Sequence, residues 1–375
     1  MLTPSLHVRV LSTGAHVPGP PISNDDLAKL VGPLPQEVLQ GMQVSRRHWL
    51  IDPATGEHQT STSAMAAAAA RQALARARVS ADEVDLVVMS TASPEYPLPA
   101  SVTYVQEELG LAQCAVVELR AGCVGAVQAF DLARRYLSDG DYRTALVIGA
   151  ESISPALAPL FLGREPEKIR MRDRLPVYTF GDGAGAAVLR GVDRSAARGE
   201  GTYATGCVGA LQSPGMRIVG GGTDIPAHRQ QARKRMIDLQ LDIRATAESG
   251  PRVFTEALTD MLNRSGLSLS EIDACVLPEG NAEYFTREMV QAGLTEEDFA
   301  VLQSRVLENL ADVAATGSAA VPLALNDAWQ SGRLRRGDTV MLLAIEASRF
   351  LYAGLTLSWN ASAPAKDESG GLVFA

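Results

Sequence analysis

The residue with the clearest chemical potential is Cys123, a thiol between small residues where two sequence patterns meet. The apolar run at residues 115–117 predicts a strand before it, and residues 124–137 predict a helix after it. A thiol at a helix N-terminus meets the positive end of the helix dipole and unpaired N–H groups, which favour the thiolate. Gly122 and Gly125 let a substrate approach the backbone closely. This arrangement suits acyl transfer through a covalent thioester, while a buried cysteine at an ordinary turn would give the same pattern.

Composition sets the class of protein in which that thiol sits. The chain has 375 residues, 46% apolar and 21% charged, which is enough for two core-bearing halves of a globular enzyme. A net charge of -9 argues against nucleic-acid binding. The four cysteines show no metal-ligand or disulfide spacing, so we expect neither a metal nor a cofactor. The N-terminus lacks a signal pattern and the apolar stretches are strand-length, so we expect a cytoplasmic protein that does not enter a membrane.

The chain repeats its own pattern. Residues 74–89 and residues 262–277 each read as a helix end, a connector with serine and glutamate, and an apolar strand. Residues 137–152 and 330–348 form a second matching pair in the same order. These repeats predict two similar α/β halves, at residues 1–190 and 191–375. The nearly continuous Val, Leu and Ile runs predict strands covered on both faces.

The first half closes on FGDGAGAAVL at residues 180–189, whose glycines permit tight packing before a buried strand. A phosphate loop would link a strand to a helix, so a nucleotide site is not expected here. Together with the cysteine turn and the duplicated halves, this segment resembles the thiolase superfamily, and within it ketoacyl-acyl-carrier-protein synthase III. The resemblance runs from about Leu6 to Trp359. It implies a five-layer αβαβα fold, a homodimer in which the loop of Leu98 reaches the partner's acyl tunnel, and acyl-CoA or acyl-carrier-protein substrates.

The chain departs from this family at two catalytic positions. Members that condense with decarboxylation use cysteine, histidine and asparagine. Here the histidine segment reads LPEGNA at residues 277–282, so Pro278 or Glu279 takes the histidine position, while Asn281 keeps the motif's asparagine. Ala315 takes the position of the catalytic asparagine. Each lost donor costs about 2.7–4 kcal/mol of transition-state stabilisation, so we expect no malonyl decarboxylation.

Acyl loading needs only a thiolate and an oxyanion hole. The resemblance assigns that hole to the N–H groups of Cys123 and Ser348. Arg349 beside it would hold a carboxylate-bearing acyl group, or is a surface arginine. Glu279 is a general base for an incoming acceptor if burial raises its pKa, or is a loop carboxylate. His228, Asp312 and Glu95 are weaker alternatives, each more easily explained as a solvated residue.

Donor recognition is only half matched. Family members that take CoA often stack its adenine between a tryptophan and an arginine. Arg174 matches the arginine, but residues 34–38 offer no tryptophan. A carrier-protein donor or acceptor becomes more attractive for that reason. The basic run at residues 229–235 would suit an acidic carrier protein, or is a solvated helix face.

The leading hypothesis is an acyltransferase of specialised metabolism that passes the Cys123-bound acyl group to a small-molecule or carrier-bound acceptor. Two alternatives stay open. One is carbon–carbon bond formation by Claisen condensation, of the ketoacyl synthase III or hydroxymethylglutaryl-CoA synthase type. The other is a non-catalytic partner subunit of an active paralogue, against which the retained Cys123 argues. The fold alone does not decide between these functions.

Overall fold

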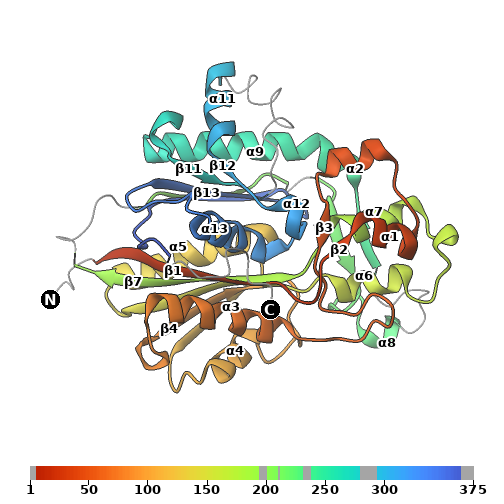
Figure 1. The fold of residues 1–375 in the computed structure, drawn as a ribbon, viewed down its shortest axis with the longest axis horizontal. Coiled ribbons are helices and arrows are strands. Elements are labelled where there is room, and N and C mark those ends of the chain that lie inside the picture. Colours follow the sequence, from red (N-terminus) through yellow and green to blue (C-terminus); the bar gives the residue numbers. More distant parts are fainter. Residues whose placement is uncertain (1–5, 194–200, 210–211, 231–237, 279–293, 365–375) are drawn as a thin grey trace.

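The structure is a computed structural model, and it describes residues 6–193, 201–209, 212–230, 238–278 and 294–364 (Figure 1). Helices and strands alternate in the first part of the chain. In order they are β1 (His7–His16), β2 (Ile22–Ser23), α1 (Asn24–Val31), α2 (Gln36–Met42), β3 (Arg46–Arg47), α3 (Thr62–Ala77), η1 (Ala81–Glu83), β4 (Leu86–Ser90), α4 (Ser101–Leu109), β5 (Ala115–Leu119), η2 (Gly122–Val124), α5 (Gly125–Ser138), β6 (Thr144–Glu151), α6 (Ser154–Phe161), η3 (Pro166–Lys168), α7 (Met171–Thr179) and β7 (Gly183–Val192).

The second part of the chain follows the same alternation, where η denotes a short 3₁₀ turn as in the first part. Its described elements are β8 (Tyr203–Cys207), β9 (Met216–Val219), α8 (Ala227–Gln230), β10 (Asp238–Leu241), α9 (Ile243–Ser265), η5 (Leu269–Glu271), β11 (Ala274–Val276), α11 (Glu296–Arg305), β12 (Val306–Leu307), α12 (Leu310–Val313), η7 (Gly317–Ala319), α13 (Ala320–Gln330), β13 (Thr339–Glu346) and β14 (Leu351–Ser358).

Two five-stranded sheets carry the fold, in the orders β1-β7-β6-β4-β5 and β12-β11-β13-β14-β8. In the first sheet β4 runs parallel to β5 and β6, and β7 runs antiparallel to β6 and β1. In the second sheet β11 runs parallel to β12 and β13, and β14 runs antiparallel to β13 and β8. The two sheets therefore share one pattern of directions, and the two similar halves predicted from the repeats are confirmed.

The elements stack in five layers. Figure 1 shows α3 and α4 outside the first sheet, α5 and α13 between the sheets, and α9 with α11 outside the second sheet. The middle helices touch both sheets: α5 contacts β4, β6 and β14, and α13 contacts β7, β11 and β13. The predicted αβαβα architecture is confirmed.

Burial explains why the middle layer forms. Every residue of β6 is buried, because helices cover both faces of its sheet. The apolar face of α5, including Val127 and Phe130, packs into the core between the sheets, and Trp329 of α13 enters the same core. The helix predicted at residues 124–137 is confirmed as α5 with a start one residue later.

The repeat extends to local hydrogen bonds. Ser80 and Glu83 form a capping box before β4, and Ser268 and Glu271 form its counterpart before β11. Such boxes satisfy N–H groups that the short turns leave unpaired. Matching local chemistry in both halves supports the internal duplication.

One local expectation needs correction. Only Gly181 of the FGDGAGAAVL glycines precedes the buried strand, because β7 begins at Gly183 and includes both Gly183 and Gly185. A side-chain carbon at Gly185 would lie 2.7 Å from the carbonyl carbon of Pro322 in α13. The missing side chains therefore let α13 lie directly on the first sheet.

Among the described helices, none has both the length and the apolar character needed to cross a membrane.

Candidate active site

Cys123 lies in the η2 turn, between the end of β5 and the start of α5. Its side chain is half-buried and forms no disulfide. Gly122 has a φ of 55°, a left-handed conformation that favours glycine. The N–H of Gly125 bonds to the Gly122 carbonyl, so the turn leads directly into the helix. The predicted position of the thiol, after a strand and at a helix N-terminus, is confirmed.

The second half contains a counterpart of this turn. Gly317 has a φ of 54° and opens η7, which leads into α13 as η2 leads into α5. Ser318 occupies the position that Cys123 has in the first half. The same number of residues separates Gly122 from Gly317 and Glu151 from Glu346, so the correspondence holds in the sheets as well.

The two turns meet across the interface between the halves. Ser318 donates from Oγ to the carbonyl of Gly122 at 3.0 Å, and its Oγ lies 3.1 Å from Oγ of Ser90 at the end of β4. A side-chain carbon at Gly125 would fall 1.9 Å from that same Ser90 Oγ. The carbonyl before the thiol is therefore held by a serine of the second half, which is itself hydrogen-bonded to a serine of the first.

A buried glutamate lies beneath each turn. Glu151 ends β6, is 3% exposed, and accepts bonds from the Ala92 N–H at 2.9 Å and the Ser318 N–H at 3.1 Å. It also accepts a bond from the Ser93 hydroxyl. Burial raises the pKa of Glu151, because removing the carboxylate from water disfavours its charge.

Glu346 ends β13 and occupies the matching place beneath the thiol turn. It is 4% exposed. Its Oε1 accepts the Ser348 N–H at 2.8 Å, and its Oε2 accepts the Ser348 hydroxyl at 2.7 Å. A side-chain carbon at Gly122 would lie 3.0 Å from Cγ of Glu346 and 3.3 Å from its Oε1. The carboxylate therefore fills the space that a side chain at position 122 would need.

The two residues expected beside the thiol after β13 are in the turn that follows Glu346. Ser348 is half-buried, and its N–H, the predicted oxyanion donor, is bonded to Glu346. Arg349 is exposed, and its guanidinium donates to the Gln212 carbonyl at 2.8 Å. The backbone therefore brings Ser348 to the site, while the Arg349 side chain contacts a loop.

Pro278 and Ala315, which stand at the family's histidine and asparagine positions, lie after β11 and before η7. Pro278 is buried directly after β11, which runs beside β13, so both strands end at the same edge of the sheet. Ala315 bridges to Phe180 and precedes η7. Neither Pro278 nor Ala315 has a side-chain donor. Glu279 and Asn281 lie outside the described residues.

The loop of Leu98 lies on the surface. Leu98 is 85% exposed and Tyr96 is 55% exposed, which is unusual for large apolar side chains. Glu95 in the same loop is half-buried and accepts bonds from the Ser63 N–H and the Ser101 hydroxyl. Those bonds favour a role for Glu95 in holding the loop.

Arg174 is engaged by backbone carbonyls. Its guanidinium donates to Ile169 at 2.9 Å, Pro33 at 3.0 Å and Pro166 at 3.1 Å, and it lies against Gly32. These bonds join two loops around α7. They fix the orientation of the guanidinium group.

Two weaker base candidates are placed at the surface. Asp312 forms an ion pair with Arg46, whose Nε and Nη2 both donate to Asp312 Oδ1, at 2.9 and 2.6 Å. His228 is exposed in α8. Only residues 229 and 230 of the basic run at residues 229–235 are described.

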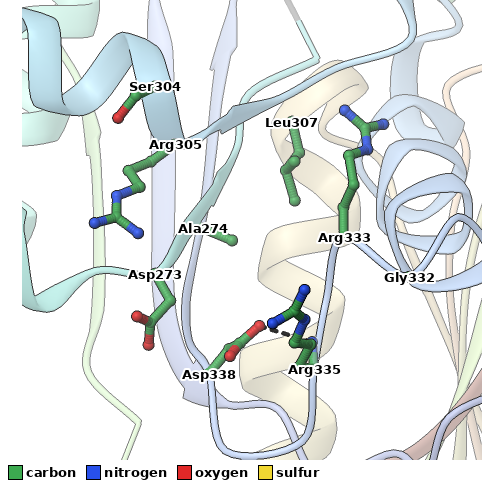
Figure 2. Close-up of a pocket in the computed structure, with 9 residues that line it drawn as sticks. All are labelled: Asp273, Ala274, Ser304, Arg305, Leu307, Gly332, Arg333, Arg335 and Asp338. Atoms are coloured by element: carbon green, nitrogen blue, oxygen red, sulfur yellow. Dashed lines mark hydrogen bonds between the residues drawn. The ribbon is translucent and has the colours of Figure 1, made fainter.

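A hollow of about 580 Å³ lies at the end of the second sheet where β11 and β13 begin. It is bordered by Asp273 before β11, Asp338 before β13 and the side chains of Arg305, Arg333 and Arg335. Figure 2 shows the three guanidinium groups on different sides of the hollow. The carboxylate of Asp338 accepts a hydrogen bond from the backbone N–H of Arg335. Because β13 ends at Glu346 beside the thiol turn, this hollow at its start is separate from the candidate site.

No group of histidine, cysteine and carboxylate side chains within the described ranges has the arrangement of a metal site.

Comparisons with known proteins agree with this geometry. The model of the 3-oxoacyl-[acyl-carrier-protein] synthase III family matches residues 117–205, and the model of its C-terminal part matches residues 262–359. A beta-ketoacyl-[acyl-carrier-protein] synthase III of Rhodospirillum centenum is 34% identical over 355 residues, which cover 93% of this chain and 98% of the relative. The chain therefore belongs to the 3-oxoacyl-[acyl-carrier-protein] synthase III family and has its thiolase-like fold.

Two solved structures are similar over nearly the whole chain. AbyA1, described as a tetronic acid condensing enzyme, is 28% identical with a TM-score of 0.77, covering 94% of this chain and 99% of AbyA1. The 3-oxoacyl-(acyl carrier protein) synthase III of Pseudomonas aeruginosa PAO1 is 25% identical with a TM-score of 0.75, covering 96% of this chain and 100% of that enzyme. The chain is thus a transferase of the ketoacyl synthase III type.

Sequence reasoning missed Glu346, Glu151 and Ser318. Both glutamates lie in repeated segments and end apolar strands at matching places, whereas Ser318 lies outside the repeated segments. The matching glutamates at the two strand ends were visible in the sequence. Their positions beneath the glycine turns were not, because those positions depend on how the two halves pack.

Proposed function

We propose that the chain is an acyltransferase that forms an acyl thioester on Cys123 and passes the acyl group to another molecule. The observation that carries this proposal is the thiol on a turn at the N-terminus of α5, held from both halves through Gly122. There the helix dipole and backbone N–H groups favour the thiolate. The donor is an acyl-CoA or an acyl carrier protein.

In the first step, the Cys123 thiolate attacks the donor thioester, and the donor thiol leaves. The N–H groups of Cys123 and Ser348 stabilise the developing oxyanion. Because the Ser348 N–H is bonded to Glu346 at rest, the acyl oxygen must compete with that carboxylate for it. Acyl loading is therefore coupled to the state of Glu346.

In the second step, an acceptor takes the acyl group without malonyl decarboxylation. Ala315 and Pro278 supply no donor to an enolate, which decarboxylation requires. A carboxylate base suits a hydroxyl or amine acceptor instead, and Glu279 is the candidate from the sequence. Asn281 would contact the substrate beside it. Acceptors of this kind, small or carrier-bound, fit an enzyme of specialised metabolism.

Three further residues complete the proposed substrate contacts. Arg349 would bind a carboxylate on the acyl group after leaving the Gln212 carbonyl. Arg174 would present its guanidinium plane to the CoA adenine. Leu98, exposed together with Tyr96, would enter the acyl tunnel of a second copy in a cytoplasmic homodimer. Light scattering of the purified protein tests the dimer directly.

A second candidate function is carbon–carbon bond formation. The names of the relatives favour it, since the Rhodospirillum centenum protein is called a synthase and AbyA1 a condensing enzyme. The experiment loads Cys123 and then adds either malonyl-CoA or a panel of alcohols and amines. The proposal predicts acyl esters or amides and no release of CO₂. A ketone product with CO₂ release would replace the proposal by the condensing function.

A further inference from the structure

Glu346 is a buried carboxylate at the thiol turn to which the family resemblance gives no role. Three donors hold it: the N–H and hydroxyl of Ser348 and, at 3.3 Å, the N–H of Arg349. All three donors are neutral groups. The carboxylate is thus fixed in position by hydrogen bonds, and none of these donors is a cationic side chain.

The position of Glu346 relative to the thiol follows from Gly122. A carbon atom added to Gly122 would meet Oε1 of Glu346 at 3.3 Å, and Cys123 is the next residue in the chain. Oε1 thus lies near Gly122 and also accepts the Ser348 N–H, whereas Oε2 accepts the Ser348 hydroxyl and the Arg349 N–H. The carboxylate therefore lies beside the residue that directly precedes the thiol.

The other polar groups of the family's site are replaced. Alanine stands at position 315 and proline at position 278, and neither side chain can take or give a proton. A transfer step still needs a base, because a hydroxyl or water is a poor nucleophile until its proton is removed.

We propose that Glu346 is the acid–base residue of the transfer step, a proposal that rests on the acyltransferase function above. The Glu346 carboxylate takes the proton of the acceptor while the acceptor oxygen or nitrogen bonds to the thioester carbonyl carbon. The carbon–sulfur bond then breaks, and the protonated Glu346 returns that proton to the Cys123 sulfur. The sum is acyl-cysteine plus acceptor giving acylated acceptor plus thiol, with no other reactant.

Glu151 is the counterpart of Glu346, beneath a turn that carries Ser318 in place of a cysteine. It ends β6 beneath Ser318 and bonds to the Ser318 N–H, so one function of a glutamate here is to hold the turn. A variant of Glu346 must therefore be judged by a measurement that a purely structural role would leave unchanged. Water and hydroxylamine supply it, since water needs a base and hydroxylamine attacks thioesters without one.

The experiment follows the acyl-enzyme by intact-protein mass. Wild type and Glu346→Gln are loaded from whichever of acetyl-CoA and octanoyl-CoA acylates wild type, the donor is removed, and loss of the acyl group is timed in buffer and in hydroxylamine. Glu346→Gln should lose the acyl group to water at least about 100-fold more slowly, and to hydroxylamine within about three-fold of wild type. Equal loss to water, or equal slowing with both nucleophiles, would overturn the proposal.

Three further variants sharpen the result. Asp327→Asn removes a different, half-buried carboxylate of the second half and should leave both rates within about two-fold of wild type. Glu279→Gln tests the sequence candidate, and a loss of water reactivity in that variant alone would assign the base to Glu279 and overturn the proposal. If Glu346→Gln does not take up acyl groups, Glu346→Asp carries the test with at least about ten-fold slower loss to water and unchanged loss to hydroxylamine; equal rates with water would overturn it.

Failure of the proposed function is distinguishable from failure of this inference. If neither donor acylates wild type while other thioesters do, the same timing is run with the effective donor. If no thioester acylates wild type, the acyltransferase function itself fails, and Glu346 has no transfer step to serve. If wild type is acylated and Glu346→Gln behaves like it, only the role of Glu346 fails.

Discussion

Ser318 of the second half donates a hydrogen bond from its hydroxyl to the carbonyl of Gly122 in the first half, at 3.0 Å. That carbonyl also accepts the N–H of Gly125, which starts α5. The residue directly before the thiol is therefore held both by its own helix and by the opposite half. The candidate active site exists only when the two halves are packed together.

Removing the Ser318 hydroxyl should lower the rate of Cys123 acylation more than it lowers the stability of the protein. In Ser318→Ala, we expect a loss of about 1–2 kcal/mol in unfolding free energy, since the buried hydroxyl loses its bonds to Gly122 and Ser90. The rate of Cys123 acylation should fall about ten-fold, because the turn is less well positioned. Ser331→Ala, which removes an exposed hydroxyl bonded to the Asp327 carbonyl at the far end of α13, is the matched control. Equal acylation rates for both variants would contradict this role of Ser318.

Adding a side chain at Gly149, where β6 contacts η7, should strongly destabilise the fold. A side-chain carbon there would lie 2.0 Å from the Ser318 carbonyl oxygen, which is backbone and has no other rotamer. Gly149→Ala should cost about 3 kcal/mol of unfolding free energy, measured with urea. Gly41→Ala in α2 meets no atom within 4 Å and should instead gain about 1 kcal/mol, since alanine favours a helix. A stable Gly149→Ala protein would show that η7 is not seated on β6.

Ala314 precedes the position of the missing asparagine and carries backbone strain. It has a φ of 62° and a ψ of -167°, a region that alanine rarely adopts. Ala314→Gly should therefore raise the unfolding free energy by about 1 kcal/mol, although glycine also costs entropy on folding. Ala320→Gly, at a φ of -58° in the first turn of α13, should lower it by about the same amount. A loss of stability in both variants would mean that Ala314 is unstrained.

The sequence predicted well what depends on local periodicity. The strand before Cys123, the helix after it and the paired strands β6 and β13 follow from runs and spacing along one segment. The contacts of Arg174 did not follow, because its carbonyl partners come from two segments far apart in the sequence, at Pro33 and at residues 166–169. The sequence likewise located the Ser348 N–H but gave no sign that Glu346 would bind it, since that bond depends on how one short turn folds back.

The stability of the protein should depend on pH through Asp327. Burial raises the pKa of Asp327 to about 6 from an ordinary value of 3.8. Folding then favours the protonated acid, so this contribution is full below about pH 4 and is lost as the pH rises through about 6. Asp327→Asn imitates the protonated form. Its stability relative to wild type should grow between pH 4 and pH 7, by up to about 3 kcal/mol. A difference that does not change with pH would show that Asp327 titrates normally.

The central claim is that Cys123 carries the acyl group, and intact-protein mass after incubation with a panel of acyl-CoA and acyl-carrier-protein thioesters tests it most directly. One acyl group should be gained by wild type and by Cys207→Ala, which removes the exposed cysteine, and none by Cys123→Ala. The donor that gives the adduct also identifies the acyl group. An adduct that persists in Cys123→Ala, or the absence of any adduct on wild type with every donor, would contradict the account, and the second result would favour a non-catalytic partner subunit.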